Sequence, residues 1–150
     1  MKLISHRGNL SGPRPNEENN PNKINFVIQS GYDVEVDVWS VNSDLFLGHD
    51  EPKHLVDLQW FLNNKSKLWI HCKNIEALLE LSQETLNVFW HQEDDFTLTS
   101  AGYIWTYPGN KLTKRSIAVM PENCSDEWSI ANLKKSFGIC TDYIHKYEVV

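Results

Sequence analysis

Short apolar runs recur along the whole chain, and most of them alternate apolar with polar positions as β-strands do. The expected strands lie at 3–6, 33–39, 45–49, 67–73, 87–92, 102–107, 116–120 and 137–144. Segments with helical spacing separate several of these runs. A strand followed by a helix, repeated along the chain, predicts an α/β fold around a largely parallel sheet.

Four helices are expected between the strands. The first begins at Pro21 after the N-cap Asn20 and ends at Gly31. The other three begin near Pro52, after Asn74, and at Ser125 with Asp126. Their apolar faces comprise Ile24, Val27 and Ile28 in the first, Leu55, Leu58, Phe61 and Leu62 in the second (52–65), Ile75, Leu78 and Leu79 in the third, and Trp128 and Leu133 in the fourth.

Two connections stand out between these elements. Asn42 and Ser43 form a tight turn, so residues 45–49 are expected to make a hairpin with the second strand. The polar stretch 8–22, rich in Pro, Gly and Asn, directly follows the first strand. Loops of this length are usually either functional or disordered.

Composition narrows the classes of function. The chain has 150 residues, which suits one domain, and its net charge of −6 argues against nucleic acid as the main ligand. Cys72, Cys124 and Cys140 lack the paired spacing of a zinc cluster or a disulfide framework, so reduced thiols in a cytoplasmic protein are expected. The first residues turn polar too early for a signal peptide, and no apolar run approaches the ~20 residues of a transmembrane helix.

Titratable residues gather where the expected strands end. The set comprises His6 and Arg7, Glu35 and Asp37, His49 and Asp50, and His71 and Lys73. The carboxyl ends of parallel strands form the binding sites of α/β proteins. Alternation places Trp69, His71 and Lys73 on one face of their strand, and it leaves the other, apolar face for overlying helices.

Glu35 and Asp37 stand two positions apart, so their carboxylates share one face of the second strand. Such a pair is either a solvated edge or the ligand set of a hard cation such as Mg²⁺ or Ca²⁺. Two nearby histidines would supply a general base and a general acid, and Arg7 with Lys73 would bind an anion. This inventory fits the cleavage of a phosphodiester.

Several motifs resemble one known family in both order and spacing. They are SHRGN, the EN of NEEN, GYDVEVDVW, LFLGHDEP and FGICTDYI. Together they are similar to the glycerophosphodiester phosphodiesterases, a family of phosphatidylinositol-phosphodiesterase-like barrels. The resemblance implies a TIM-type barrel and a metal-dependent hydrolase of glycerophosphodiesters or related phospholipid head-group esters.

The resemblance also implies a role for individual residues. These are His6 and His49 as the acid/base pair, Arg7 and Lys73 on the phosphate, Glu35, Asp37 and His71 on the metal, and Glu18, Asp50 and His91 as supporting groups. His71 stands where the family has a carboxylate. A histidine binds Mg²⁺ or Ca²⁺ poorly and suits transition metals better. A core histidine bonded to Asp37 is the alternative, and metal identity stays open.

The chain is short for such a fold, since TIM barrels need about 250 residues. About seven parallel strands are expected, joined by connections in the second half that are too short for helices. The sequence therefore predicts a reduced (β/α) barrel over residues 1–150, with some outer helices shortened or missing. A phosphate-binding module without catalysis is the alternative function, and a homodimer is the expected partner arrangement besides a small phosphodiester substrate.

Overall fold

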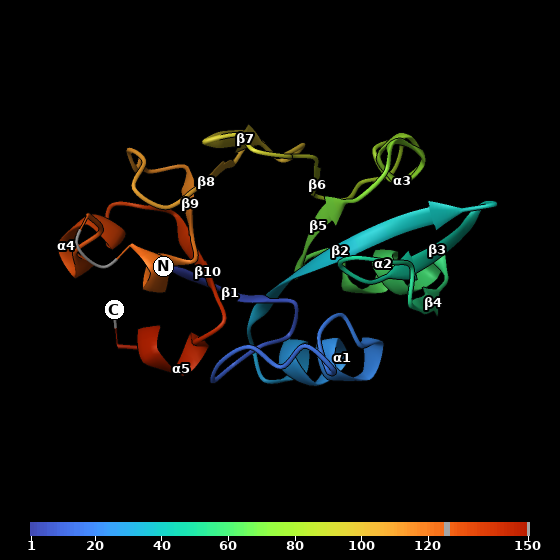
Figure 1. The fold of residues 1–150 in the computed structure, drawn as a ribbon, viewed down its shortest axis with the longest axis horizontal. Coiled ribbons are helices and arrows are strands. Elements are labelled where there is room, and N and C mark those ends of the chain that lie inside the picture. Colours follow the sequence, from blue (N-terminus) through green and yellow to red (C-terminus); the bar gives the residue numbers. More distant parts are fainter. Residues whose placement is uncertain (125–126, 150) are drawn as a thin grey trace.

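The computed structural model describes residues 1–124 and 127–149, which form a ten-stranded mixed sheet. The sheet curls into an open half-barrel (Figure 1). Its strands are β1 (Lys2–His6), β2 (Asp33–Val41), β3 (Asp44–Leu47), β4 (His54–Val56), β5 (Leu68–Cys72), β6 (Val88–Phe89), β7 (Phe96–Leu98), β8 (Ile104–Thr106), β9 (Ser116–Val119) and β10 (Gly138–Thr141).

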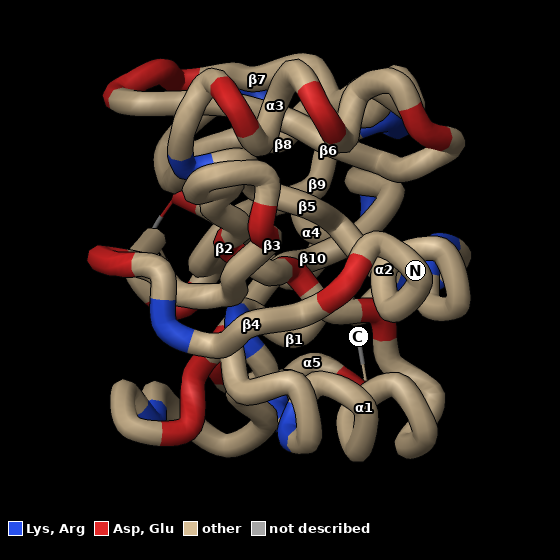
Figure 2. Tube along the Cα trace, turned by 90° about the vertical axis from the view of Figure 1, so that its right-hand side faces the viewer, with Lys and Arg blue, Asp and Glu red and all other residues tan. Residues whose placement is uncertain are grey.

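Short helices cover the outside of this sheet. They are α1 (Pro21–Gln29), α2 (Leu58–Asn64), α3 (Ile75–Leu81), α4 (Ile130–Leu133), α5 (Ile144–Tyr147) and the 3₁₀ helix η1 (Pro121–Asn123). The helices α1, α2 and α3 lie around the half that contains β2 and β5, and α4 and α5 lie beside β9 and β10 (Figure 1). Lysines and arginines are scattered among acidic residues on the side of the first group, where α3 carries acidic positions (Figure 2).

The strands β6, β5, β2, β1, β10, β9 and β8 are joined in that order by parallel pairing. Antiparallel pairing adds the β3 and β4 hairpin to β2, and β7 to β8. The length of β2 allows two strands, β1 and β3, to pair with the same edge of it. Its first half pairs with β1, and its second half pairs with β3 along the same edge, because β1 ends at His6.

The expected reduced (β/α) TIM-type barrel is wrong, because the sheet stays open. No ladder joins β6 to β8 in the described residues, so the parallel run has two ends. The connection between them contains no helix and instead forms β7, antiparallel to β8. Ser100 bridges the seam: its N–H donates to the carbonyl of Val88, its hydroxyl oxygen accepts from the Val88 N–H, and the hydroxyl donates to the carbonyl of Leu86.

The helix predictions had mixed outcomes in the first half of the chain. The first helix is confirmed, with the Asn20 side chain accepting from the N–H groups of Asn22 and Lys23. The second was expected from Pro52, but residues 54–56 form the edge strand β4, and α2 begins only after its N-cap Asp57. The apolar spacing of Leu55 and Leu58 predicted one continuous helix. Leu55 instead pairs with Phe46 of β3 as part of a strand.

Of the other turn and helix predictions, some are confirmed and some are wrong. Asn42 and Ser43 have φ values of 53° and 67°, as a two-residue hairpin turn requires. Asn74 caps α3 as expected, but Ile75 and Leu79 point outward and are exposed, and Ala77 and Leu81 are buried instead. The expected fourth start, Ser125 and Asp126, lies outside the described residues, and α4 begins at Ile130 after the N-cap Ser129.

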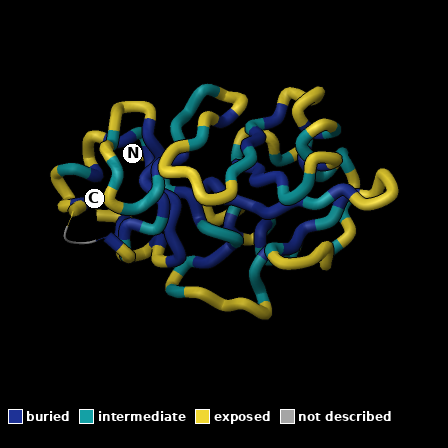
Figure 3. The backbone as a smooth tube through the Cα atoms, turned by 45° about the horizontal axis from the view of Figure 1, so that its top comes forward, coloured by how far each residue is buried: buried dark blue, intermediate teal, exposed yellow. Residues whose placement is uncertain are grey.

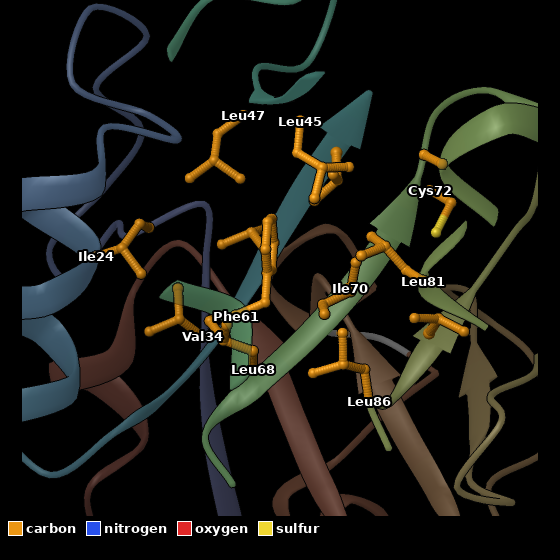
Figure 4. Packing of buried hydrophobic residues seen from close by; sticks show 14 of the residues in the cluster. Ile24, Val34, Leu45, Leu47, Phe61, Leu68, Ile70, Cys72, Leu81 and Leu86 are labelled. Carbon is orange, nitrogen blue, oxygen red and sulfur yellow. The ribbon is translucent and has the colours of Figure 1, made fainter. Parts of the chain in front are cut away.

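Alternation along β2 and β5 divides apolar from polar side chains, as the pattern predicted. The outward side chains of both strands pack with α1, α2 and α3 in the largest apolar cluster (Figure 4). Phe61 of α2 is fully buried at its centre, beside Val34 and Leu68. The tube in Figure 3 shows this buried band running through the middle of the molecule. Two inward side chains of β2, those of Glu35 and Asp37, belong to the site described below.

We expect Phe61→Ala to lower the free energy of unfolding by about 3–5 kcal/mol, because it leaves a cavity in this cluster. Phe26→Ala in the neighbouring helix is the matched control, since the Phe26 side chain is 56% exposed. Urea unfolding followed by circular dichroism measures both changes. Equal losses for the two variants would contradict the packing of α2 against β2 and β5.

Candidate functional site

One cavity of about 520 Å³ opens at the carboxyl ends of the parallel strands. Since parallel strands end on the same side of a sheet, residues from distant parts of the chain meet there. The lining includes most of the residues singled out in the sequence: His6, Arg7, Glu35, His49, His71, Lys73 and His91. The structure therefore brings these groups together, and their chemical roles stay predictions.

Asp37 lies beneath this cavity with no exposed surface and is held on both carboxylate oxygens. Oδ1 accepts from His71 Nδ1 at 2.9 Å, and Oδ2 accepts from the Asn19 amide at 2.9 Å and lies 2.9 Å from Arg7 Nε. The Lys73 ammonium lies 3.7 Å from Oδ1. Burial alone raises the pKa of Asp37, but the His71 hydrogen bond and the two cations outweigh burial and lower the pKa well below its ordinary value.

Glu35, two residues earlier, is almost as deeply buried but has few partners. Its Oε2 makes no hydrogen bond with the described residues and lies 4.0 Å from His6 Nε2, and its Oε1 lies 3.9 Å from His71 Nδ1. Burial and the charge of Asp37 raise the pKa of Glu35. The pKa values of the two neighbouring carboxylates are therefore shifted in opposite directions, upward for Glu35 and downward for Asp37.

His6 ends β1, and Asp142 just after β10 holds its ring. The Nδ1–H group donates to Asp142 Oδ1 at 2.8 Å, and the Asn9 amide donates to the same oxygen at 2.8 Å. Burial lowers the pKa of His6, but the Asp142 hydrogen bond and the charge of Glu35 outweigh burial and raise it overall. With Nδ1 fixed in this way, Nε2 is the nitrogen directed toward Glu35.

His49 follows the β3 strand at the mouth of the cavity, with 39% of its side chain exposed. Its Nδ1 pairs with Asp50 at 2.6 Å. Burial lowers the pKa of His49, and the charges of Arg7 and Lys73 act in the same direction. His6 and His49 thus share one arrangement, in which a carboxylate takes Nδ1 and leaves Nε2 for other partners.

Arg7 has a φ of 53° and turns from the end of β1 toward β2. Besides its contact with Asp37, its Nη1 donates to Glu18 Oε2 at 3.3 Å. Glu18 also accepts from the Asn9 amide at 2.8 Å, so the long loop after β1 folds back onto the site. Glu18, expected as a supporting group, thus contacts Arg7, and its role stays a prediction.

His91, just after β6, lies against the ring of His71 with centroids 4.4 Å apart and planes 14° apart. Its Nδ1–H donates to the carbonyl of Gln92 at 3.1 Å, and its Nε2 bonds with the Tyr107 hydroxyl. Burial and the neighbouring His71 lower the pKa of His91 to about 4. His91 is therefore a neutral ring that contacts His71 directly.

Glu35, Asp37 and His71 form a group that could hold a metal ion, since one ligand atom from each lies within 4.8 Å of the others. Two observations fit a cation. Glu35 Oε2 is buried without a hydrogen-bond partner in the described residues. In addition, the carboxylates in contact with the site outnumber its permanent cations: Glu18, Glu35, Asp37 and Asp142 against Arg7 and Lys73.

Sequence reasoning missed several residues of the site. Asn19 donates to Asp37 and also accepts from the Asp37 N–H at 3.0 Å, in a backbone conformation with φ of 56° that asparagine tolerates better than most residues. Asn9, Tyr107 and Asp142 were also not singled out in the sequence. A run of asparagines in a long polar loop was the one signal for Asn19.

The electrostatic difference between the two carboxylates predicts opposite effects on stability. Because the folded pKa of Glu35 is raised, ionising it costs stability at pH values above its unfolded pKa. Glu35→Gln should therefore raise the free energy of unfolding at neutral pH without added metal. Asp37→Asn should lower it by about 3–5 kcal/mol, because Arg7 and His71 lose their buried partner.

Chemical unfolding at pH 7 in the presence of a chelator measures both variants. The Asp37 contribution should also fade as acid protonates this carboxyl, since a lowered folded pKa stabilises the fold only above it. Loss of stability in Glu35→Gln equal to that in Asp37→Asn would contradict the partner assignment of the two carboxylates.

None of the helices in the described part of the chain has the length and apolar character of a membrane span. Comparisons of the chain with models of protein families, with curated proteins and with solved structures find no match. The function is therefore argued from the site itself.

Proposed function

We propose that this protein is a divalent-cation-dependent phosphodiester hydrolase that acts on glycerophosphodiesters or related phospholipid head-group esters. The supporting observation is one cavity lined by four imidazoles and two cationic side chains, with the carboxylate pair Glu35 and Asp37 buried at its floor. Each class of group has a separate task in phosphodiester cleavage: the cations bind the anion, the imidazoles move protons, and the carboxylates hold a metal ion.

Arg7 and Lys73 are the phosphate-binding residues in this proposal. Both contact Asp37, which fixes their charged groups at the floor of the cavity. A phosphodiester carries one negative charge, so it is attracted to these cations and repelled by an uncompensated Glu35. Glu18 holds the guanidinium from the other side at 3.3 Å, which limits its rotation.

A cation held by Glu35, Asp37 and His71 would polarise a phosphoryl oxygen and offset charge that develops during cleavage. It would also compensate Glu35, whose Oε2 has no hydrogen-bond partner in the described residues. The surroundings of the carboxylates add to these interactions. Burial of the carboxylates keeps bulk water from the floor of the site, which strengthens electrostatic interactions there.

His6 and His49 carry the proton transfers. In each ring a carboxylate holds Nδ1, so Nε2 is available to accept or donate a proton at the cavity. One imidazole removes a proton from the nucleophile, and the other protonates the departing alcohol. The nucleophile is water or the adjacent hydroxyl of the substrate, and the second route releases a cyclic phosphate that product analysis identifies.

The described cysteines are free and buried, which supports a reducing compartment such as the cytoplasm for this enzyme.

We expect His6→Ala and His49→Ala each to lower turnover of glycerophosphodiesters by about 10²–10⁴-fold, because each removes one proton-transfer group. His145→Ala is the matched control, since His145 is half exposed and pairs only with Glu148 in the described residues. Release of free alcohol measures the rate. Near-normal turnover in both cavity variants would contradict the acid/base roles.

Removal of the cation should abolish turnover and leave the fold in place. Dialysis of the protein against a chelator, followed by addition of single divalent ions, tests this in the same cleavage assay. If inorganic phosphate binds but no ion restores turnover, the protein is the non-catalytic anion-binding module, and Arg7→Ala should then abolish that binding.

A further inference from the structure

The third potential ligand of the carboxylate pair is an imidazole, and its surroundings hold it still. His71 is buried, and its Nδ1 lies 2.9 Å from Asp37 Oδ1 and 3.9 Å from Glu35 Oε1. Its ring lies nearly parallel to that of Phe89, with centroids 5.3 Å apart and planes 4° apart. His71 Nδ1, the nitrogen that faces the carboxylates, is therefore fixed by both polar and aromatic contacts. A metal ion bound there would take the place of the hydrogen on Nδ1, and the neutral ring would carry its hydrogen on Nε2 instead.

His91 adds a second near-parallel ring to His71, and its own orientation is fixed as well. A carbonyl oxygen only accepts hydrogen bonds, so the contact with Gln92 places a hydrogen on His91 Nδ1. Its Nε2 bonds with the Tyr107 hydroxyl. These two hydrogen bonds hold the ring of His91 beside that of His71.

Part of the negative charge of these carboxylates is already paired with cationic side chains, which disfavours a hard cation. Asp37 already contacts Arg7 and Lys73, and Ca²⁺ sites reach high affinity by accumulating charged oxygen ligands. Mg²⁺ similarly prefers oxygen ligands. A neutral imidazole suits first-row transition metals such as Zn²⁺ better than it suits Mg²⁺ or Ca²⁺.

Independent evidence for a missing cation comes from Glu35. The residue is only 3% exposed, and its Oε2 has no hydrogen-bond partner in the described residues. Burying an unpaired carboxylate oxygen is costly. A metal ion bonded to this oxygen and to His71 would satisfy it.

We propose that the ion held by Glu35, Asp37 and His71 is a first-row transition-metal ion, for which Mn²⁺ and Zn²⁺ are the probes, and that His91 is a positioning residue for His71. This inference rests on the proposed function in taking these three residues as the site of its cation. It differs from the hard-cation site that the paired carboxylates predicted in the sequence.

Isothermal titration of the metal-free protein with Mn²⁺, Zn²⁺, Mg²⁺ and Ca²⁺, without substrate, tests the preference. Mn²⁺ and Zn²⁺ should each bind at one site at least about tenfold more tightly than Mg²⁺ and Ca²⁺. Glu35→Gln should remove this site. His71→Glu should reverse the order, because it restores an all-oxygen ligand set. Tighter binding of Mg²⁺ or Ca²⁺ by the unaltered protein, or an unchanged order in His71→Glu, would overturn the proposal.

The positioning role has its own test. His91→Ala should weaken Mn²⁺ and Zn²⁺ binding by about 10–100-fold, as loss of a supporting group around a metal ligand does elsewhere. His91→Phe keeps a flat ring beside His71 and should restore most of the affinity. Absorption bands of bound Co²⁺ should change in His91→Ala and recover in His91→Phe. Unchanged affinity in His91→Ala, or no recovery in His91→Phe, would overturn this role.

These measurements separate the inference from the proposed function. Binding of Mn²⁺ or Zn²⁺ at the site without phosphodiester cleavage would support the metal assignment and contradict the hydrolase. Cleavage that Mg²⁺ supports and that Mn²⁺ and Zn²⁺ do not would support the hydrolase and contradict the metal assignment.

Discussion

The ion pair between Arg7 and Asp37 is the interaction on which the site depends. Asp37 has no solvent contact, so its charge must be balanced inside the protein. The balancing groups come from the end of β1, from the loop that follows it and from β5, and they are Arg7, Asn19, His71 and Lys73. One buried carboxylate therefore fixes the relative positions of three segments that are distant in the sequence.

Strand β2 supplies that carboxylate because its two faces have opposite chemistry. The valines between Asp33 and Trp39 point outward to α1, α2 and α3, and the acidic residues between them point inward. The inward face is not uniform. Asp33, at the start of β2, pairs with Lys2 and Lys67 and is balanced, whereas Glu35 has an unpartnered oxygen. The unpartnered carboxylate oxygen thus belongs to the residue of this face that lines the cavity.

The open seam shows how few residues this arrangement needs. A closed barrel surrounds its site with paired strands, but here β6 has two residues and, within residues 1–124 and 127–149, pairs with β5 alone. Hydrogen bonds of the Ser100 backbone and side chain replace a ladder at this point. The aromatic residues beside the seam, Trp105 and Tyr107, complete the wall of the cavity through packing with Phe89 and His91. Side-chain packing and the hydrogen bonds of Ser100 thus close the wall of the cavity, which strand pairing closes in a complete barrel.

The sequence by itself determined the strands of the parallel run, the caps at Asn20 and Asn74, and the faces of β2 and β5, because alternation and capping depend on neighbouring residues. It also singled out the histidines and the charged residues that line the cavity, since strand ends are readable locally. Only the tertiary structure decided that the barrel stays open, that residues 54–56 join β3 instead of α2, and that Asn19 balances Asp37. Those outcomes depend on pairing between distant segments, which no local pattern of residues encodes.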